Sequence, residues 1–316
     1  EIAPDKIGLA VNSSEARELH RIGKKVAMIG VENAYPLGLD ISRVKEFYDR
    51  GARYMSLSHN GHSQFCDSNT GEKDSLWIDK GVSNLGKQVI EEMNKLGMMI
   101  DISHPSKQSI KDMISLSKAP IIASHSSARA LCNHSRNLDD EQLEWMKSNG
   151  GVVQTVAFSS YVNSEKHIAY SSALSKKVEN LAREREMEMK SWDEIRKLEA
   201  ADREIYVKQY RVMSKEAAKS MNESDPKPVD VADYVDHIDY LVEKIGLDHV
   251  GISSDFDGGG GIYGWNDASE TLNVTAELLK RGYSEDEISQ LWSGNLLRVL
   301  DRVEEVAKKL QTKGKV

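Results

Sequence analysis

Two histidines that follow similar apolar segments are the residues of this sequence best placed to do chemistry. The segments Met98–Ile102 and Pro120–Ala123 are short, apolar and strand-like. Each is followed by Ser-His, which places His104 and His125 21 residues apart. This spacing is about the length of one βα unit, in which a strand is followed by a loop, a helix and the next parallel strand. We therefore expect both imidazoles at the carboxyl ends of neighbouring strands, where α/β folds bind ligands.

Three further strand-like runs end in residues that can bind a metal or transfer a proton. These residues are Glu32, His59 and Asp255. Carboxylates together with imidazoles are the ligands preferred by Zn²⁺ or a similar divalent ion. Such an ion lowers the pKa of bound water to about 7 and polarises a carbonyl, so an amide can be hydrolysed without a Ser or Cys nucleophile. A single loop histidine is more often solvated, and only the repeated placement favours a metal site.

Composition excludes several other classes of function. The 316 residues carry a net charge of −8 without a stripe of Lys or Arg, which argues against nucleic acid or an anionic membrane as a partner. No segment approaches the ~18 apolar residues of a membrane span, so a soluble protein is expected. Its compartment is not determined by the sequence, and in a bacterium it would be the periplasm or the cytoplasm. Neither Cys66 nor Cys132 lies at a strand end, which disfavours a cysteine nucleophile.

The order of strands and helices indicates the scaffold. Six strand-then-helix units begin near residues 26, 54, 98, 120, 152 and 250, whereas a closed (β/α) barrel has eight. An open doubly wound sheet would show the same order. Polar residues at five of the six strand ends favour a barrel, because a barrel collects every strand end around one mouth. We predict an α/β fold, a TIM-like (β/α)8 barrel whose first one or two βα units are missing from this chain.

Three other stretches are interpreted as parts of this single domain, residues 1–316. Residues 164–224 are dense in alternating Glu, Lys and Arg, which is typical of a solvated helical hairpin inserted into the barrel. The run Gly258–Gly261 matches no phosphate-binding spacing and indicates a flexible rim loop near a ligand. The loop histidine His62 has no strand end to position it, and we expect it to be solvated.

Seven segments, in this order, carry a resemblance to a known family: VAMIGVENAYPLG, YMSLSHNGHS, MMIDISHPS, IIASHSSARALCNHSRN, GGVVQ, DYVDHIDYLVEKIGLDHVGISSDFDG and LLKRGYSEDEISQLWSGNLLRVL. Together they resemble the membrane (renal-type) dipeptidase family, peptidase family M19 of the amidohydrolase superfamily. The resemblance implies a binuclear zinc dipeptidase on a TIM-like barrel, often a homodimer. Its members act on short dipeptides, including those with a D-residue at the carboxyl side.

The resemblance also implies a role for each matching residue. Glu32 would bridge two zinc ions, and His104 and His125 would complete the second zinc site. Asp255 would deprotonate the attacking water and pass the proton to the leaving amine. His59 would stabilise the developing oxyanion and contact the substrate. Arg136 would hold the free carboxylate of the substrate through a charge-assisted pair of hydrogen bonds.

The sequence departs from the family pattern in two places. The family binds its first zinc through a His-x-Asp pair on a first strand, and the His-x-Asp of this chain, His237-Ile238-Asp239, falls in a helical pattern that points the two side chains apart. The usual Glu-Gly-Gly is Glu32-Asn33-Ala34 here, and the loop after Asp255 is rich in glycine. These changes resemble a bacterial branch linked to the maturation of secreted peptide metabolites.

Three functions of different classes follow. The first is a zinc-dependent dipeptidase. The second is a family member with an altered pocket that binds or modifies a peptide-derived metabolite without ordinary dipeptide hydrolysis. The third is an interaction protein that acts through the charged insertion.

Overall fold

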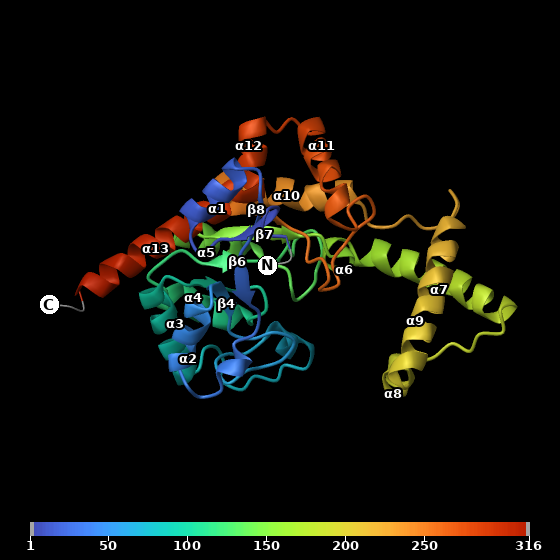
Figure 1. Cartoon of the computed structure of the whole chain (residues 1–316), viewed down its shortest axis with the longest axis horizontal. Helices are drawn as coiled ribbons and strands as arrows, with labels where there is room; N and C mark the ends of the chain where they lie inside the picture. The colour runs from blue at the N-terminus through green and yellow to red at the C-terminus, as the bar shows by residue number, and fades with distance from the viewer. Residues whose placement is uncertain (1–2, 314–316) are drawn as a thin grey trace.

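A sheet of six parallel strands forms the centre of the molecule (Figure 1). The computed structural model describes residues 3–313, and the strands in it pair in the order β3-β4-β5-β6-β7-β8, which is also their order along the chain. A sheet whose order never reverses has no switch point, so the doubly wound alternative is wrong. The strands are β3 (Ile29–Val31), β4 (Ala52–Ser56), β5 (Met99–Asp101), β6 (Ile122–Ala123), β7 (Val152–Val156) and β8 (Val250–Ser253).

The predicted α/β fold with parallel strands is confirmed, and its sheet is curled. The closed barrel is not confirmed. Within residues 3–313, β3 and β8 are the edge strands of the sheet. β3 pairs only with β4, β8 pairs only with β7, and the two edge strands do not pair with each other. A closed ring of eight strands is therefore not shown. The expectation that further βα units belong to the fold stays a prediction.

The continuous apolar run Val26–Val31 is typical of one buried strand, but the structure has two short strands there instead. β2 (Lys25–Ala27) pairs with β1 (Ile7–Leu9), a strand that the sequence reading missed, while β3 joins the main sheet. The prediction of burial is also wrong, because the side chains of Val26 and Ile29 are exposed. Among the described residues, nothing packs over this end of the sheet closely enough to bury them.

Five helices cover the outer face of the sheet. Four of them begin at a Ser or Asp whose side chain accepts a hydrogen bond from a backbone N–H of the first turn, as N-caps do. Neighbouring helices in this layer pack on one another and on the large apolar cluster formed by Met55, Ile100 and Val153 with the helices. The layer consists of α2 (Ser42–Asp49), α3 (Asn84–Leu96), α4 (Lys107–Leu116), α5 (Asp140–Asn149) and α10 (Val231–Ile245).

The C-terminal helix packs against the inner face of the sheet. Tyr54, Met99 and Val152 alternate with the outward residues and pack against Val299 and Leu300 of α13 (Asn295–Lys313). Residues 285–309 have the pattern of one helix, but a π-turn, Gln290–Gly294, interrupts it after α12 (Glu285–Ser289). The other two helices of the core are α1 (Ser13–Arg21) and α11 (Leu272–Lys280).

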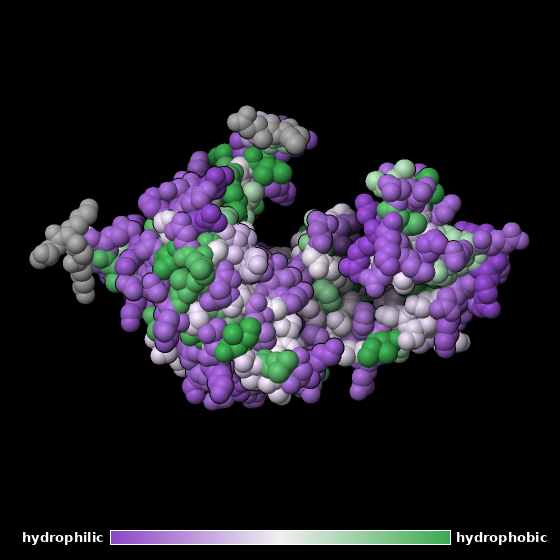
Figure 2. Space-filling view, turned by 90° about the horizontal axis from the view of Figure 1, so that it is seen from below, coloured by the Kyte–Doolittle hydropathy of each residue, from purple (hydrophilic) through white to green (hydrophobic). Residues whose placement is uncertain are grey.

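The charged insertion is helical, as predicted. After the short helix α6 (Ser159–Val162), two long helices, α7 (Ser164–Glu184) and α9 (Ala200–Lys219), pack on each other and project away from the sheet (Figure 1). The short helix α8 (Trp192–Lys197) lies beside the start of α9. The surface of this projection is mostly hydrophilic (Figure 2). No helix within residues 3–313 is both long enough and apolar enough to cross a membrane.

Candidate metal centre

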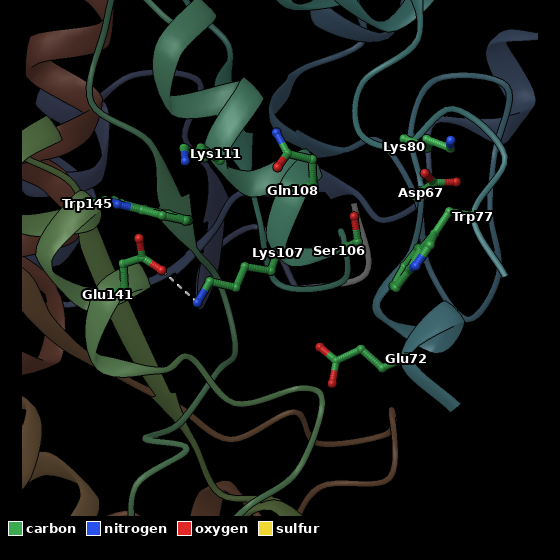
Figure 3. Close-up of a pocket in the computed structure, with 10 residues that line it drawn as sticks. All are labelled: Asp67, Glu72, Trp77, Lys80, Ser106, Lys107, Gln108, Lys111, Glu141 and Trp145. Atoms are coloured by element: carbon green, nitrogen blue, oxygen red, sulfur yellow. Dashed lines mark ion pairs between the residues drawn. The ribbon is translucent and has the colours of Figure 1, made fainter. Parts of the chain in front are cut away.

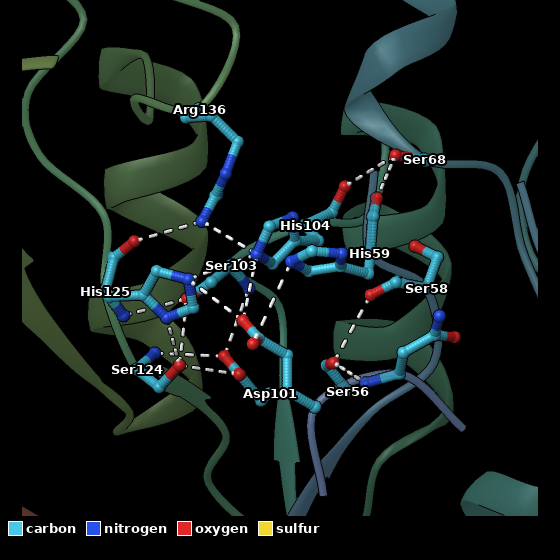
Figure 4. A network of polar contacts seen from close by, with 12 residues as sticks. Ser56, Ser58, His59, Ser68, Asp101, Ser103, His104, Ser124, His125 and Arg136 are labelled. Carbon is cyan, nitrogen blue, oxygen red and sulfur yellow. Dashed lines mark hydrogen bonds and ion pairs between the residues drawn. The ribbon is translucent and has the colours of Figure 1, made fainter. Parts of the chain in front are cut away.

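Four predicted site residues meet at the carboxyl ends of neighbouring strands (Figure 4). The Oε1 atom of Glu32 lies 3.1 Å from His104 Nε2 and 3.2 Å from His125 Nε2, and the two Nε2 atoms are 3.1 Å apart. The Nε2 atom of His59 lies 3.8 Å from Glu32 Oε2. Glu32, His59 and His104 form a group whose ligand atoms are close enough to share one ion. The parallel register therefore brings together residues that span almost a hundred positions.

A buried carboxylate that the sequence reading missed orients His125. Asp101, at the end of β5, is fully buried and accepts hydrogen bonds from the Ser124 hydroxyl at 2.6 Å and the Ser124 backbone N–H at 2.9 Å. Since the Ser124 hydroxyl donates to Asp101, it accepts the Nδ1–H of His125 at 2.7 Å. The Nε2 atom of His125 is then left with a free lone pair that points at Glu32. A charged residue inside an apolar strand was the signal in the sequence that could have identified this support.

The hydrogen-bonding pattern fits a cation between these side chains. The Nη2 atom of Arg136 lies 3.1 Å from His104 Nε2 and can only donate, so this nitrogen of His104 also presents a lone pair. Two imidazole lone pairs and a carboxylate oxygen thus converge within 3.2 Å of one another. Acceptors that face each other without a hydrogen between them repel, and a divalent ion would remove this repulsion. The donor set therefore fits a metal ion of the zinc type.

Burial sets the protonation states that such a site requires. Burial lowers the pKa of His104 to about 4, so its imidazole is neutral near pH 7 and able to bind a metal. The close contacts of Glu32 with His104 and His125 lower the pKa of its carboxyl far below the usual value. The site thus presents neutral imidazoles beside an ionised carboxylate.

Arg136 lies above the imidazoles with most of its donors unused. It is 3% exposed, and its Nε and Nη1 atoms have no hydrogen-bond partner among the described residues. The ring of Tyr161 lies 5.6 Å from its guanidinium, and Phe158 stacks on Tyr161 at 4.2 Å. A buried guanidinium whose donors have no partner can bind a carboxylate. The sequence reading did not identify the aromatic pair, because nothing in the local pattern distinguishes it from core residues.

Asp255 follows the end of β8 and begins a tight, glycine-rich loop. Its backbone is in the left-handed region, with φ of 56°, and its carbonyl accepts hydrogen bonds from the N–H groups of Gly258 and Gly260. A Cβ atom on Gly258 would lie 2.4 Å from Asp255 Oδ1. The glycine run therefore folds back over Asp255. Burial raises the pKa of the Asp255 carboxyl, and the negative charge of Glu32 acts in the same direction.

Three other residues raised by the sequence have structural roles instead. The prediction that His62 is solvated is wrong, since the ring is mostly buried and its Nδ1 accepts a hydrogen bond from the Ser68 N–H. His237 is on α10, as predicted, and is buried between Ala128 N–H and the Val162 carbonyl. Cys66 is buried, which raises the pKa of its thiol to about 12 and agrees with the exclusion of a cysteine nucleophile.

A separate cavity of about 540 Å³ lies on the flank of the sheet, between α4, α5 and the loop of residues 67–80 (Figure 3). Two of its acids are already paired, Glu72 with Arg129 and Glu141 with Lys107, each at 2.8 Å. None of the predicted site residues lines it. This cavity is therefore distinct from the candidate metal centre.

Comparison with known proteins agrees with this arrangement. The family model of the membrane dipeptidases, peptidase family M19, matches residues 2–314. The dipeptidase verJ of Clonostachys rogersoniana is 32% identical over 98% of this chain and 63% of its own length. The dipeptidase aclJ of Aspergillus oryzae is 30% identical over 92% of this chain and 54% of its own length. The chain thus spans between about half and two thirds of the length of these curated relatives. Because these relatives are fungal, they do not support the expected bacterial origin.

Solved structures are similar in fold. The probable dipeptidase PvdM from Pseudomonas aeruginosa has a TM-score of 0.74 and 36% identity, and the match covers 96% of this chain and 75% of that one. A metallopeptidase from Rhodobacter sphaeroides, bound to a phosphinate mimic of the dipeptide L-Ala-D-Ala, has a TM-score of 0.68 and 21% identity, with 94% and 69% covered. At the latter identity the likeness concerns the fold alone.

Proposed function

Because the chain belongs to the membrane dipeptidase family, peptidase family M19, we propose that it is a metal-dependent dipeptidase that hydrolyses the peptide bond of short dipeptides. The observation that carries the proposal is the convergence of Glu32 Oε1 with the two imidazole lone pairs within 3.2 Å. The proposal includes zinc as the metal, a homodimer as the assembly, and dipeptides with a D-residue at the carboxyl side among the substrates.

Glu32, His104 and His125 would hold the metal. When bound, the ion would lower the pKa of a water molecule and polarise the substrate carbonyl. The network from Asp101 through Ser124 would keep the His125 ring in the orientation that binding requires.

The remaining residues would act on the substrate itself. Asp255 makes no side-chain hydrogen bond within the described residues, and its raised pKa suits a carboxylate that accepts a proton from water and passes it to the leaving amine. His59 would donate a hydrogen bond to the developing oxyanion. Arg136 would bind the free carboxylate of the C-terminal residue through its unused Nε and Nη1 donors, which restricts the substrate to a short peptide.

The substitution Glu32→Gln tests the proposal, because it keeps the shape of the side chain and removes its charge. We expect most of the metal to be lost, and hydrolysis to fall by about 10³-fold or more, as when an electrostatic group at a reacting centre is removed. The measurements are metal content per chain and the release of free amino acids from a panel of L,L- and L,D-dipeptides. Glu72→Gln, which changes an acid paired with Arg129 outside the site, is the matched control.

A wild-type protein that holds its metal, binds dipeptides and hydrolyses none of the panel would contradict the proposed reaction. That result would favour binding of a peptide-derived molecule without hydrolysis. Light scattering of the same sample tests the dimer.

A further inference from the structure

A second cavity, of about 300 Å³, lies between the charged insertion and the loop that follows β8. One wall is a single face of α7, with residues three, four or seven positions apart, and the facing wall comes from α9 and from Gly261–Tyr263. The insertion therefore does more than project into solvent. Together with the core of the protein it forms a half-open hollow that neither part would form alone.

Most of the polar side chains around this hollow make no hydrogen bond with the described residues. No Asp, Glu, Lys or Arg is among the lining residues, so the cavity favours a neutral group. Its floor is apolar, from Leu174, Val178 and Ile262. Seven lining side chains make no hydrogen bond with any described residue: His167, Tyr170, Ser171, Ser175, Tyr210, Ser214 and Tyr263.

Hydroxyl groups gathered around an apolar floor suit a particular ligand chemistry. Phenol and serine hydroxyls both donate and accept, so they can bind amide and hydroxyl groups of either polarity. The rings of Tyr170 and Tyr263 offer flat faces for an aromatic group. Burial raises the pKa of the Tyr170 phenol, and the neighbouring Tyr263 acts in the same direction. An uncharged aromatic group that carries a hydroxyl or an amide fits this set.

The cavity shares a wall with the candidate metal centre. Ser159 lines the cavity and donates a hydrogen bond to the Gly261 carbonyl at 3.0 Å. Two residues further along α6, Tyr161 lies beside Arg136, and Phe158 packs between Tyr161 and the loop at Gly259. The wall is thus the segment that faces the proposed carboxylate-binding arginine, which places the cavity on the side of the C-terminal residue of a bound dipeptide.

We propose that this cavity is a subsite for an uncharged hydroxyl- or amide-bearing aromatic group carried on the side chain of the substrate's C-terminal residue. The inference rests on the proposed dipeptidase function and deepens it. It assigns to the insertion the task of selecting dipeptides with a long, modified side chain over dipeptides of small residues.

Two serine substitutions on α7 test the subsite. Ser171 lines the cavity, and its neighbour Ser172 is exposed and does not. We expect Ser171→Leu to fill the cavity and Ser172→Leu to leave it open. The substrates are alanyl-alanine and alanyl-Nε-(4-hydroxybenzoyl)lysine, each with the C-terminal residue in D and in L form.

With Ser171→Leu, kcat/KM for the modified lysine substrate should fall by about tenfold, the order expected from losing one or two hydrogen bonds, and should stay unchanged for alanyl-alanine. Ser172→Leu should change neither value. Equal losses on both substrates, or no loss on the modified lysine, would overturn the subsite.

Calorimetric binding of the modified dipeptide separates this inference from the proposed reaction. If the wild type hydrolyses neither substrate, the proposed reaction fails, and the dissociation constants of wild type and Ser171→Leu decide the subsite alone. A weaker dissociation constant in Ser171→Leu supports it, and equal constants overturn it. Circular dichroism and Tm of both variants show whether α7 is still folded.

Discussion

The rim around His125 and the hairpin of α7 and α9 are stabilised in opposite ways. At the rim, buried polar atoms are joined by short hydrogen bonds from Asp101 through Ser124 to the imidazole. In the hairpin, four buried residues form a small apolar cluster, Val178, Ala182, Met213 and Ala217, and exposed ion pairs surround it. The difference shows that the side chains of the candidate metal centre are oriented by buried hydrogen bonds, where an unpaired buried group would be costly, whereas the hairpin depends on apolar packing.

Asp101→Asn should have the largest effect on the rim. The amide cannot accept from both Ser124 groups as a carboxylate does, so the orientation of His125 weakens. We expect metal affinity to fall by about 10- to 100-fold, as when outer-shell partners of ligands are lost. Competition with a chelator of known affinity measures this change.

Asp67→Asn is the matched control, since Asp67 is also fully buried but binds backbone N–H groups of the loop at residues 78–81. Equal metal affinity in wild type and Asp101→Asn would show that the network supports folding only.

Met213→Ala should have the largest effect on the hairpin. Met213 is 1% exposed within the four-residue cluster, and truncation to Ala should cost about 2 kcal/mol, the lower end of such core substitutions because the cluster is small. Hydrogen exchange should rise in α7 and α9, while metal content and hydrolysis of alanyl-alanine stay unchanged. Faster exchange in β5 and β6 would show that the two regions are coupled.

Gly258→Ala tests the link between the glycine loop and Asp255. The new Cβ would lie 2.4 Å from Asp255 Oδ1, so the carboxylate must move. We expect kcat to fall by about tenfold with metal content unchanged, because a small misplacement of a reacting group is enough to slow the reaction. Unchanged kcat would remove Asp255 from the proposed proton transfer.

Arg185→Ala should have the smallest effect. Arg185 pairs with Glu216 across the hairpin at 2.5 Å, but both side chains are more than two-fifths exposed. Such pairs contribute below about 1 kcal/mol, so Tm should move very little, and less at high salt. A loss as large as that of Met213→Ala would mean that ion pairs, and not the apolar cluster, hold the hairpin together.

Much of the candidate site could be predicted from the sequence. Glu32, His59, His104, His125 and Asp255 each follow an apolar strand-like run, and parallel strands place such positions at one edge. The residues that support them were harder to identify. Asp101 is the last residue of its strand and contacts Ser124, and Tyr161 contacts Arg136. Both partners lie far along the chain, so these roles depend on contacts that local patterns do not specify.

The sequence by itself determined the order of the elements, the family and the residues at the strand ends, because these follow from hydrophobic periodicity and short motifs. Only the tertiary structure decided that residues 26–31 divide between two sheets, that the six strands are not closed into a ring within residues 3–313, and that the insertion forms a half-open cavity against the β8 loop. Pairing, closure and cavities arise from contacts between segments far apart in the chain. A sequence pattern indicates which side chains can be buried. The packing of the whole chain decides which residues they contact.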